Sequence, residues 1–219
     1  FGEDAEDATL TGGLLWQQLE RQQKQTGLTA RTLSFVPATR EHIEIMQVTL
    51  RNDGCDVLTL TPIAAIPMYG RSADNIRDHR HVTSLLHRVT LRDHGIDLHP
   101  TLTFDERGHQ KGDVTYRVWG GDREGRPPVG FQPLVRGFVG SGSYDWPQAV
   151  VCPETARLLR SGEQAQGSEV VAALWFPPVT LLPGEETSYQ LVLSIDDDPS
   201  PYLTASAVAK ALEDTKAFW

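Results

Sequence analysis

The segment from Pro67 to Arg88 carries the densest set of reactive side chains in this sequence, PMYGRSADNIRDHRHVTSLLHR. Its arginines, histidines and aspartates are interspersed with turn-forming residues, and the residues on either side are apolar and typical of strands. A charged loop held between strands is a common place for binding and catalytic groups. The residues of this loop that we expect to contact a substrate or an interface are Arg71, Asp74, Asn75, Arg77, Asp78, His79, Arg80 and His81.

A metal site is one chemistry that this loop allows. His79 and His81 are two residues apart, so a strand would place both imidazole rings on one face. With Asp78 or His87 they could then form a set of metal ligands. No third ligand follows at a spacing that recurs in metal sites, so we expect no metal here.

The arginines allow two other roles. The forked guanidinium groups of Arg71, Arg77 and Arg80 are suited to binding phosphate or hydroxyl groups at the mouth of an active site. The same charges could instead hold the loop against its own sheet and a neighbouring domain, because contacts between domains are rich in polar groups.

Cleavage of a glycoside needs a carboxylic acid beside the scissile oxygen. Asp74 and Asp78 each have an arginine nearby, so we expect no catalytic residue in this chain.

Tyr144 and Trp146 form a second candidate contact, in the glycine-rich segment GFVGSGSYDWP. Segments so dense in chain-breaking residues are often binding loops. Sugar rings stack on the faces of aromatic side chains, although the same rings could pack against another domain. We also expect Trp119 to be exposed, whereas Trp175 and Tyr189 lie in apolar strand patterns and belong to the core.

Composition limits the partners of the chain. The 219 residues include 20 Lys and Arg against 29 Asp and Glu, a formal net charge of −9, which argues against nucleic acid or an anionic membrane as the main partner. The two cysteines, Cys55 and Cys152, are too far apart in sequence for a zinc motif or a disulfide framework. No apolar run approaches the roughly 20 residues of a membrane span, and no signal peptide is evident. We expect a cytoplasmic protein.

Periodicity predicts three parts. Residues 1–27 contain many helix formers, and 13–25 in particular predict a short N-terminal helix. Residues 28–198 carry a succession of strand patterns separated by turns, which predicts a mainly β domain, an antiparallel β-sandwich. Residues 199–219 predict a C-terminal linker helix that begins near Ser200 or Thr204. Because the last helical pattern ends at a bulky aromatic pair, we expect a domain or fragment of a longer polypeptide.

Two local patterns make the strand prediction more specific. The tripeptide Asn52-Asp53-Gly54 is a turn signal that suits a hairpin, and it predicts one between residues 42–50 and a partner strand at 57–69. Residues 169–176, EVVAALWF, are apolar on both faces after the initial glutamate, which predicts a strand covered on both sides.

Four segments resemble one known family: SFVPATREHIEIMQVTLRNDG, YGRSADNIRDHRHVTSLLHR, LLPGEETSYQLVLSID and the helix that ends TKAFW. Together they resemble the N-terminal β-sandwich and linker of glycoside hydrolase family 94, and within it the 1,2-β-oligoglucan phosphorylases. The resemblance extends over nearly the whole chain from about residue 28, and the charged loop is its most specific part. It implies a supersandwich of the galactose-mutarotase-like type.

The resemblance also implies a larger enzyme that cleaves a β-linked glucan with inorganic phosphate as co-substrate, with inversion and without any other cofactor. In that family the general acid and the phosphate-binding groups lie in a C-terminal (α/α)6 catalytic domain, so none of them maps onto this sequence. The implied partners are that missing domain, a β-glucan oligosaccharide and, in a homodimer, the active site of the second subunit. A freestanding carbohydrate-binding module is the alternative, and no metal is implied by either.

Overall fold

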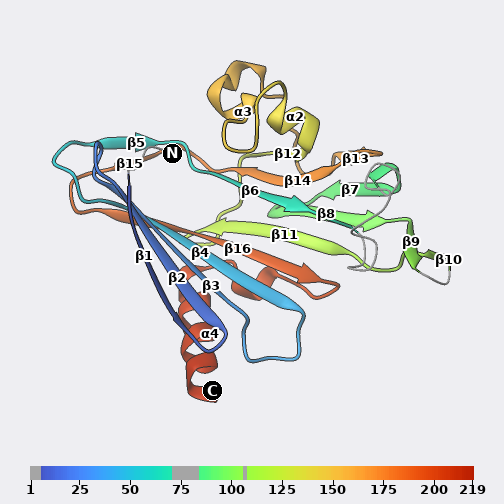
Figure 1. Ribbon diagram of the computed structural model, residues 1–219, viewed down its shortest axis with the longest axis horizontal. Coiled ribbons are helices and arrows are strands. Elements are labelled where there is room, and N and C mark those ends of the chain that lie inside the picture. The colour runs from blue at the N-terminus through green and yellow to red at the C-terminus, as the bar shows by residue number, and fades with distance from the viewer. Residues whose placement is uncertain (1–5, 71–83, 106–107) are drawn as a thin grey trace. The chain divides into compact units, whose positions relative to one another are not determined.

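A computed structural model describes residues 6–70, 84–105 and 108–219 of the chain (Figure 1). The protein is mainly β, its sheets are antiparallel, and its longest helix is at the C-terminal end, which confirms the predicted class of an antiparallel β-sandwich with a C-terminal helix. The chain forms two compact units. The first comprises Phe1–Pro62, Trp119–Pro127 and Pro177–Trp219, and the second comprises Ile63–Val118 and Pro128–Phe176.

The first unit is built on long antiparallel strands, with β1, β2, β3, β4 and β16 adjacent in that order and a separate pair formed by β5 and β15. Its elements are β1 (Glu6–Gly13), β2 (Trp16–Gln23), β3 (Leu28–Phe35), β4 (Ile43–Asn52), β5 (Leu58–Leu60), β15 (Val179–Leu181), β16 (Glu186–Ile195), the 3-10 helix η3 (Ser200–Tyr202) and α4 (Ala205–Phe218).

The N-terminal helix predicted for residues 13–25 is wrong, because residues 16–23 form strand β2. This strand lies between two partners and pairs with both along its whole length, from Trp16 opposite Gly13 and Phe35 to Gln23 opposite Glu6 and Leu28. Helix propensities differ by only a few tenths of a kcal/mol per residue among ordinary residues, about 0 to 0.7 relative to alanine. Hydrogen bonding on both sides therefore outweighs the preference of the Gln- and Glu-rich sequence for a helix.

The hairpin predicted at Asn52-Asp53-Gly54 is also wrong. Strand β4 pairs with β3 and β16 and not with the strand that follows it in sequence. The turn instead packs against the connection between β2 and β3, where the Asp53 N–H donates to the Gly27 carbonyl at 2.9 Å. A Cβ atom at Gly27, whose φ is +71°, would lie 2.5 Å from the Gly54 nitrogen, so this close approach requires glycine.

Helix α4 packs on the first unit through a buried cluster. Its side chain Val208, which is fully buried, joins Leu33, Phe35, Ile43, Ile45, Val192 and Leu203. The helix begins as predicted at Thr204, whose hydroxyl accepts a hydrogen bond from the Ala207 N–H at 3.2 Å. Near its other end, the Thr215 hydroxyl accepts from the Ala38 N–H at 3.1 Å.

Within the described part of the chain, no helix has the length and apolar character needed to cross a membrane.

The second unit contains the three-stranded sheet β12-β14-β6, the neighbouring strands β8, β7 and β13, and the hairpin of β9 and β10. Its elements are β6 (Ile63–Met68), β7 (His87–Leu91), β8 (Gly95–Pro100), β9 (Leu102–Asp105), β10 (Gly108–Lys111), β12 (Gly130–Leu134), α2 (Val135–Val139), α3 (Gln148–Val151), the 3-10 helix η2 (Pro153–Thr155), β13 (Gln164–Gln166) and β14 (Val170–Trp175). Strand β11 (Tyr116–Asp122) divides between the units after Val118.

Strand β14 is the central strand of the second core. All six of its residues are buried, which confirms the prediction of a strand covered on both faces. One face packs against α2 and α3, where the rings of Phe138 and Trp175 meet edge to face with centroids 5.9 Å apart. The two short helices lie over this sheet in Figure 1, and the chain between them forms an outer loop.

Candidate functional site

A groove of about 470 Å³ lies on the β13-β7-β8 strands of the second unit, within the size range of ligand sites. The strand register places its polar side chains in two rows. Gln166, Arg88 and His99 are opposite one another across three strands, and Gln164, Thr90 and Asp97 form the next row. Residues two apart on a strand share a face, so both rows point to the same side.

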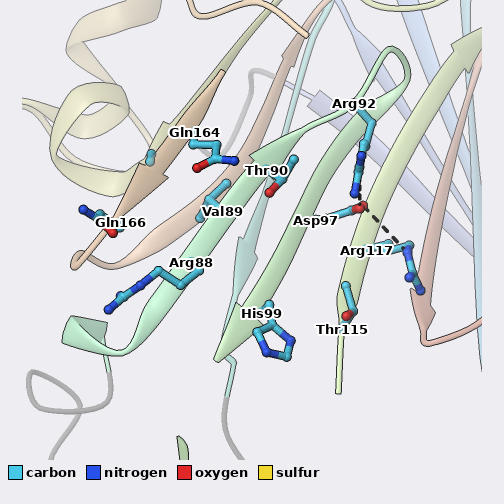
Figure 2. Close-up of a pocket in the computed structure, with 11 residues that line it drawn as sticks. Arg88, Val89, Thr90, Arg92, Asp97, His99, Thr115, Arg117, Gln164 and Gln166 are labelled. Carbon is cyan, nitrogen blue, oxygen red and sulfur yellow. Dashed lines mark hydrogen bonds and ion pairs between the residues drawn. The ribbon is translucent and has the colours of Figure 1, made fainter. Parts of the chain in front are cut away.

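The residues between these positions are buried. Val89, Leu91, Ile96 and Leu98 alternate with the groove residues along β7 and β8, and each is at most 2% exposed. The apolar face fixes the two strands on the core, and the opposite face presents the polar side chains. Thr115, just before β11, and Arg117, near the start of β11, complete the groove on the side of β8 (Figure 2).

Asp97 lies between two arginines of the groove, as Figure 2 shows. The Arg92 Nε–H donates to Asp97 Oδ2 at 2.9 Å, and the Arg117 Nε lies 3.8 Å from Asp97 Oδ1. The Asp97 side chain is only 9% exposed, so the ion pairs are shielded from water more than surface pairs are. The carboxylate thereby holds two guanidinium groups at the groove, and neither of its oxygens is without a cationic neighbour.

The other polar groups of the groove suit hydroxyl recognition. His99 Nδ1 lies 3.1 Å from the Val114 carbonyl oxygen, which can only accept, so Nδ1 carries the proton and Nε2 is left as an acceptor in the neutral ring. Gln164 and Gln166 contribute amides with both donor and acceptor atoms. The groove therefore combines charged donors with neutral groups of both polarities.

The loop between α2 and α3 presents Tyr144 and Trp146, whose exposed fractions are 45% and 69%. Short-range hydrogen bonds fix its backbone, because the Trp146 N–H donates to Ser143 Oγ at 3.1 Å and the Ser143 N–H donates to the Trp146 carbonyl at 3.2 Å. A Cβ atom at Gly142 would lie 2.1 Å from the Trp146 carbonyl oxygen, so this tight turn requires glycine. The glycine-rich segment thus forms a loop with a hydrogen-bonded backbone that exposes two aromatic side chains.

Not all predicted site residues can be placed. The eight candidates of the charged loop, Arg71, Asp74, Asn75, Arg77, Asp78, His79, Arg80 and His81, lie outside the described residues and stay a prediction. From the same stretch, Arg88 is described and lies in the groove. The expectation that Trp119 is exposed is wrong, because this ring packs against the buried cluster of the first unit. Trp175 and Tyr189 are buried, as predicted.

The groove itself was not predicted from the sequence. A signal was present, because HRVTLR and IDLHP alternate charged or polar residues with apolar ones. That alternation indicates a polar strand face, but it does not say which polar side chains lie opposite one another.

No protein-family model matches the chain, and no curated protein matches its sequence. Several solved structures match its fold in part, and they come from carbohydrate-active enzymes. A bacterial glucoamylase in complex with acarbose has 11% identity and a TM-score of 0.46 over 97% of this chain and 26% of that one. A polysaccharide lyase has 10% identity and a TM-score of 0.40 over 90% of this chain and 23% of the lyase.

A GH36 α-galactosidase variant from Geobacillus stearothermophilus in complex with stachyose has 11% identity and a TM-score of 0.35 over 90% of this chain and 26% of that chain. The present chain spans about a quarter of the length of each of these structures. Similarity at this level assigns neither a substrate nor a reaction to the chain.

Proposed function

We propose that this chain is an accessory β-sandwich domain of an enzyme that acts on carbohydrate and is not catalytic by itself. The observation that supports the proposal is the exposure of Trp146, at 69%, on a loop whose backbone is fixed by hydrogen bonds. Burying apolar surface contributes about 25 cal/mol per Å². A sugar ring or a neighbouring domain that covers the indole would gain this stabilisation without having to order the loop first.

We further propose that the parent enzyme is an inverting phosphorylase of β-linked glucans, with β-1,2-glucan as the substrate. The sequence resemblance supports this step. In such an enzyme the (α/α)6 catalytic domain follows α4 and supplies the general acid, and inorganic phosphate is the co-substrate. The charged loop that includes Arg77, Asp78 and Arg80 then contacts the catalytic domain or the active site of a second subunit.

The buried carboxylate of the groove does not suggest a different reaction. Glycoside cleavage requires one carboxylic acid that protonates the leaving oxygen and a second nucleophilic or basic partner. Asp97 has Arg92 Nε at 2.9 Å and Arg117 Nε at 3.8 Å, so its contacts are those of a residue that positions cations. We therefore assign Asp97 a positioning role.

A second candidate is a freestanding carbohydrate-binding module. The exposed pair of Tyr144 and Trp146 favours it as well, because a stacking platform needs no catalytic domain to hold a sugar. The two candidates differ in whether the chain binds an oligosaccharide alone.

Titration calorimetry with β-1,2-glucooligosaccharides separates the two candidates. For a module, we expect binding that Trp146→Ala weakens about tenfold, since aromatic stacking contributes about 0.5–1.5 kcal/mol beyond the area it buries. Val150→Ala, at a 38% exposed position of the neighbouring helix α3, is the matched control and should leave binding unchanged.

For an accessory domain, the isolated chain should give no heat, and the same two variants are then compared in the full-length enzyme. Trp146→Ala should lower subunit assembly or phosphorolysis, and Val150→Ala should not. The proposal is overturned if Trp146→Ala changes neither oligosaccharide binding nor assembly nor turnover. Phosphate-dependent release of glucose 1-phosphate by this chain alone would overturn its non-catalytic assignment.

A further inference from the structure

The groove on β13, β7 and β8 carries a charge opposite to that of the whole chain. Its lining includes three guanidinium groups, from Arg88, Arg92 and Arg117, and one carboxylate, from Asp97. Two positive charges are therefore in excess at this face, whereas the formal net charge of the chain is −9. A positive concavity on an acidic protein raises the local concentration of anions and selects them from neutral solutes.

Two acidic residues that adjoin the groove residues in sequence make their hydrogen bonds elsewhere. Asp93 accepts a hydrogen bond from the Ser161 hydroxyl, and Glu163 accepts one from the Arg160 N–H. Neither belongs to the groove lining, in which Asp97 is the one carboxylate among the described residues. The excess positive charge is thus a property of the groove lining.

Two of the arginines are oriented before any ligand arrives. Arg92 donates from Nε to Asp97 Oδ2 at 2.9 Å, and this bond holds its guanidinium group at the groove. Arg88 donates from Nη1 to the carbonyl oxygens of Leu85 and His87, at 3.1 and 2.9 Å, and these bonds anchor it at the other end of β7. Donors that are already held in place lose little conformational entropy on binding and favour planar oxyanions.

The remaining side chains would bind hydroxyl groups and not charges. His99 offers an acceptor at Nε2, and the amides of Gln164 and Gln166 offer donors and acceptors along the outer strand. A small inorganic anion would leave these groups without ligand partners, and a neutral sugar would cover the excess guanidinium charge without compensating it. Both mismatches lower affinity, because desolvated polar groups without partners cost free energy.

We propose that this groove is a binding site for an acidic saccharide, a sugar that carries a carboxylate or a phosphate monoester. Because Arg88 and Arg92 are held at opposite ends of β7, the oxyanion contacts the guanidinium group of one of them, and the sugar hydroxyls contact Gln164, Gln166 and His99. This site uses residues different from those of the aromatic loop around Trp146. It can therefore be correct or wrong independently of the function proposed above.

The test measures binding of four probes to the chain by titration calorimetry at low ionic strength: glucuronic acid, glucose 6-phosphate, inorganic phosphate and glucose. We expect glucuronic acid, glucose 6-phosphate or both to bind at least tenfold more tightly than inorganic phosphate and glucose. Preference for one of the two acidic sugars identifies the oxyanion as carboxylate or phosphate ester, and comparable affinities show that the site accepts either.

Arg88→Gln or Arg92→Gln should weaken binding about tenfold to a hundredfold, since hydrogen bonds to charged groups contribute about 1.5–3 kcal/mol, and the variant with the larger loss identifies the arginine that contacts the oxyanion. Arg136→Gln removes an exposed arginine of α2 in the same unit and should change nothing. Thermal unfolding of each variant verifies that the fold is retained. Glucose or inorganic phosphate binding as tightly as the acidic sugars, affinities unaffected by both groove variants, or no binding of any probe would each overturn the proposal.

Discussion

Asn52 is the side chain whose replacement tests the first unit most directly. It is fully buried at the end of β4, and its Nδ2 group donates to the carbonyl oxygens of Asp56 and Leu181 at 2.7 and 2.9 Å. Its Oδ1 accepts from the Gly54 N–H at 3.0 Å. One amide therefore holds the turn after β4 and the distant strand β15 together. Only a group with two donors and one acceptor at these positions satisfies all three contacts.

The expected loss for Asn52→Ala follows from these bonds. Three neutral hydrogen bonds contribute about 1 kcal/mol each, and a buried acceptor left without a donor adds about 1–3 kcal/mol. Water entering the space left by the amide recovers part of this, so we expect the unfolding free energy to fall by about 3–4 kcal/mol. That is a large fraction of the roughly 5–15 kcal/mol that typically stabilises a folded protein.

Asn52→Asp keeps the size of the side chain and replaces the Nδ2 donor group with an oxygen that can only accept. The new carboxylate faces two carbonyl oxygens, so the folded state disfavours its charge and raises its pKa above the unfolded value of about 3.9. A raised folded pKa means that stability is fully present below the unfolded pKa and is lost as the pH rises through the folded pKa. We therefore expect this variant to be much less stable than the wild type at pH 7 and to recover part of the difference near pH 4.

Urea unfolding, followed by circular dichroism at pH 7 and pH 4, measures both effects. Thr59→Ala is the control, because Thr59 is exposed on β5. Among the described residues, its hydroxyl bonds the Thr180 hydroxyl, at 3.3 Å. Its unfolding free energy should change by less than about 0.5 kcal/mol. A loss below about 1 kcal/mol for Asn52→Ala, or an Asn52→Asp deficit that does not depend on pH, would refute this account of the Asn52 contacts.

Two further predictions concern the C-terminal part of the first unit. Burial and the hydrogen bond to Glu41, at 2.7 Å, raise the pKa of Tyr202 to about 12. The unfolding free energy of the wild type should therefore fall more steeply than that of Tyr202→Phe from about pH 10 to 12. Equal slopes for the two proteins would contradict this. Val208→Ala should lower the unfolding free energy by about 2 kcal/mol, because two fully buried methyl groups are lost. Lys210→Ala, on the exposed face of α4, should have little effect. Chemical denaturation of both variants measures the difference and shows whether α4 belongs to the core.

The sequence predicts those elements of the fold whose signal is local. The all-apolar run of β14 and the N-cap at Thr204 each depend on neighbouring residues, and the structure confirms both. The buried positions of Trp175 and Tyr189 are also evident from the strand patterns around them. In these cases periodicity or a single capping residue carries the required information.

The two wrong elements have a common physical cause, since long-range pairing decides them. Residues 16–23 have the composition of a helix, but their strand partners on both sides are residues 6–13 and 28–35. Residues 52–54 do form a turn, but the turn does not lead into a hairpin. The strand beside β4 is β16, more than 130 residues later in the chain. Propensity and turn chemistry specify local conformation, whereas pairing is set by the packing of the complete sheet.

The groove shows the same limit at the level of chemistry. Arg88 and His99 lie opposite one another because Val89 pairs with Leu98, and Gln166 joins that row because Ala165 pairs with Val89. A shift of one residue in either pairing would turn the apolar side chains outward and the charged ones into the core. The burial of Val89 and Leu98 therefore fixes where the positive charge collects. The electrostatics of the proposed site follow from the hydrophobic core beneath it, and a variant that alters the register should remove stability and anion binding together.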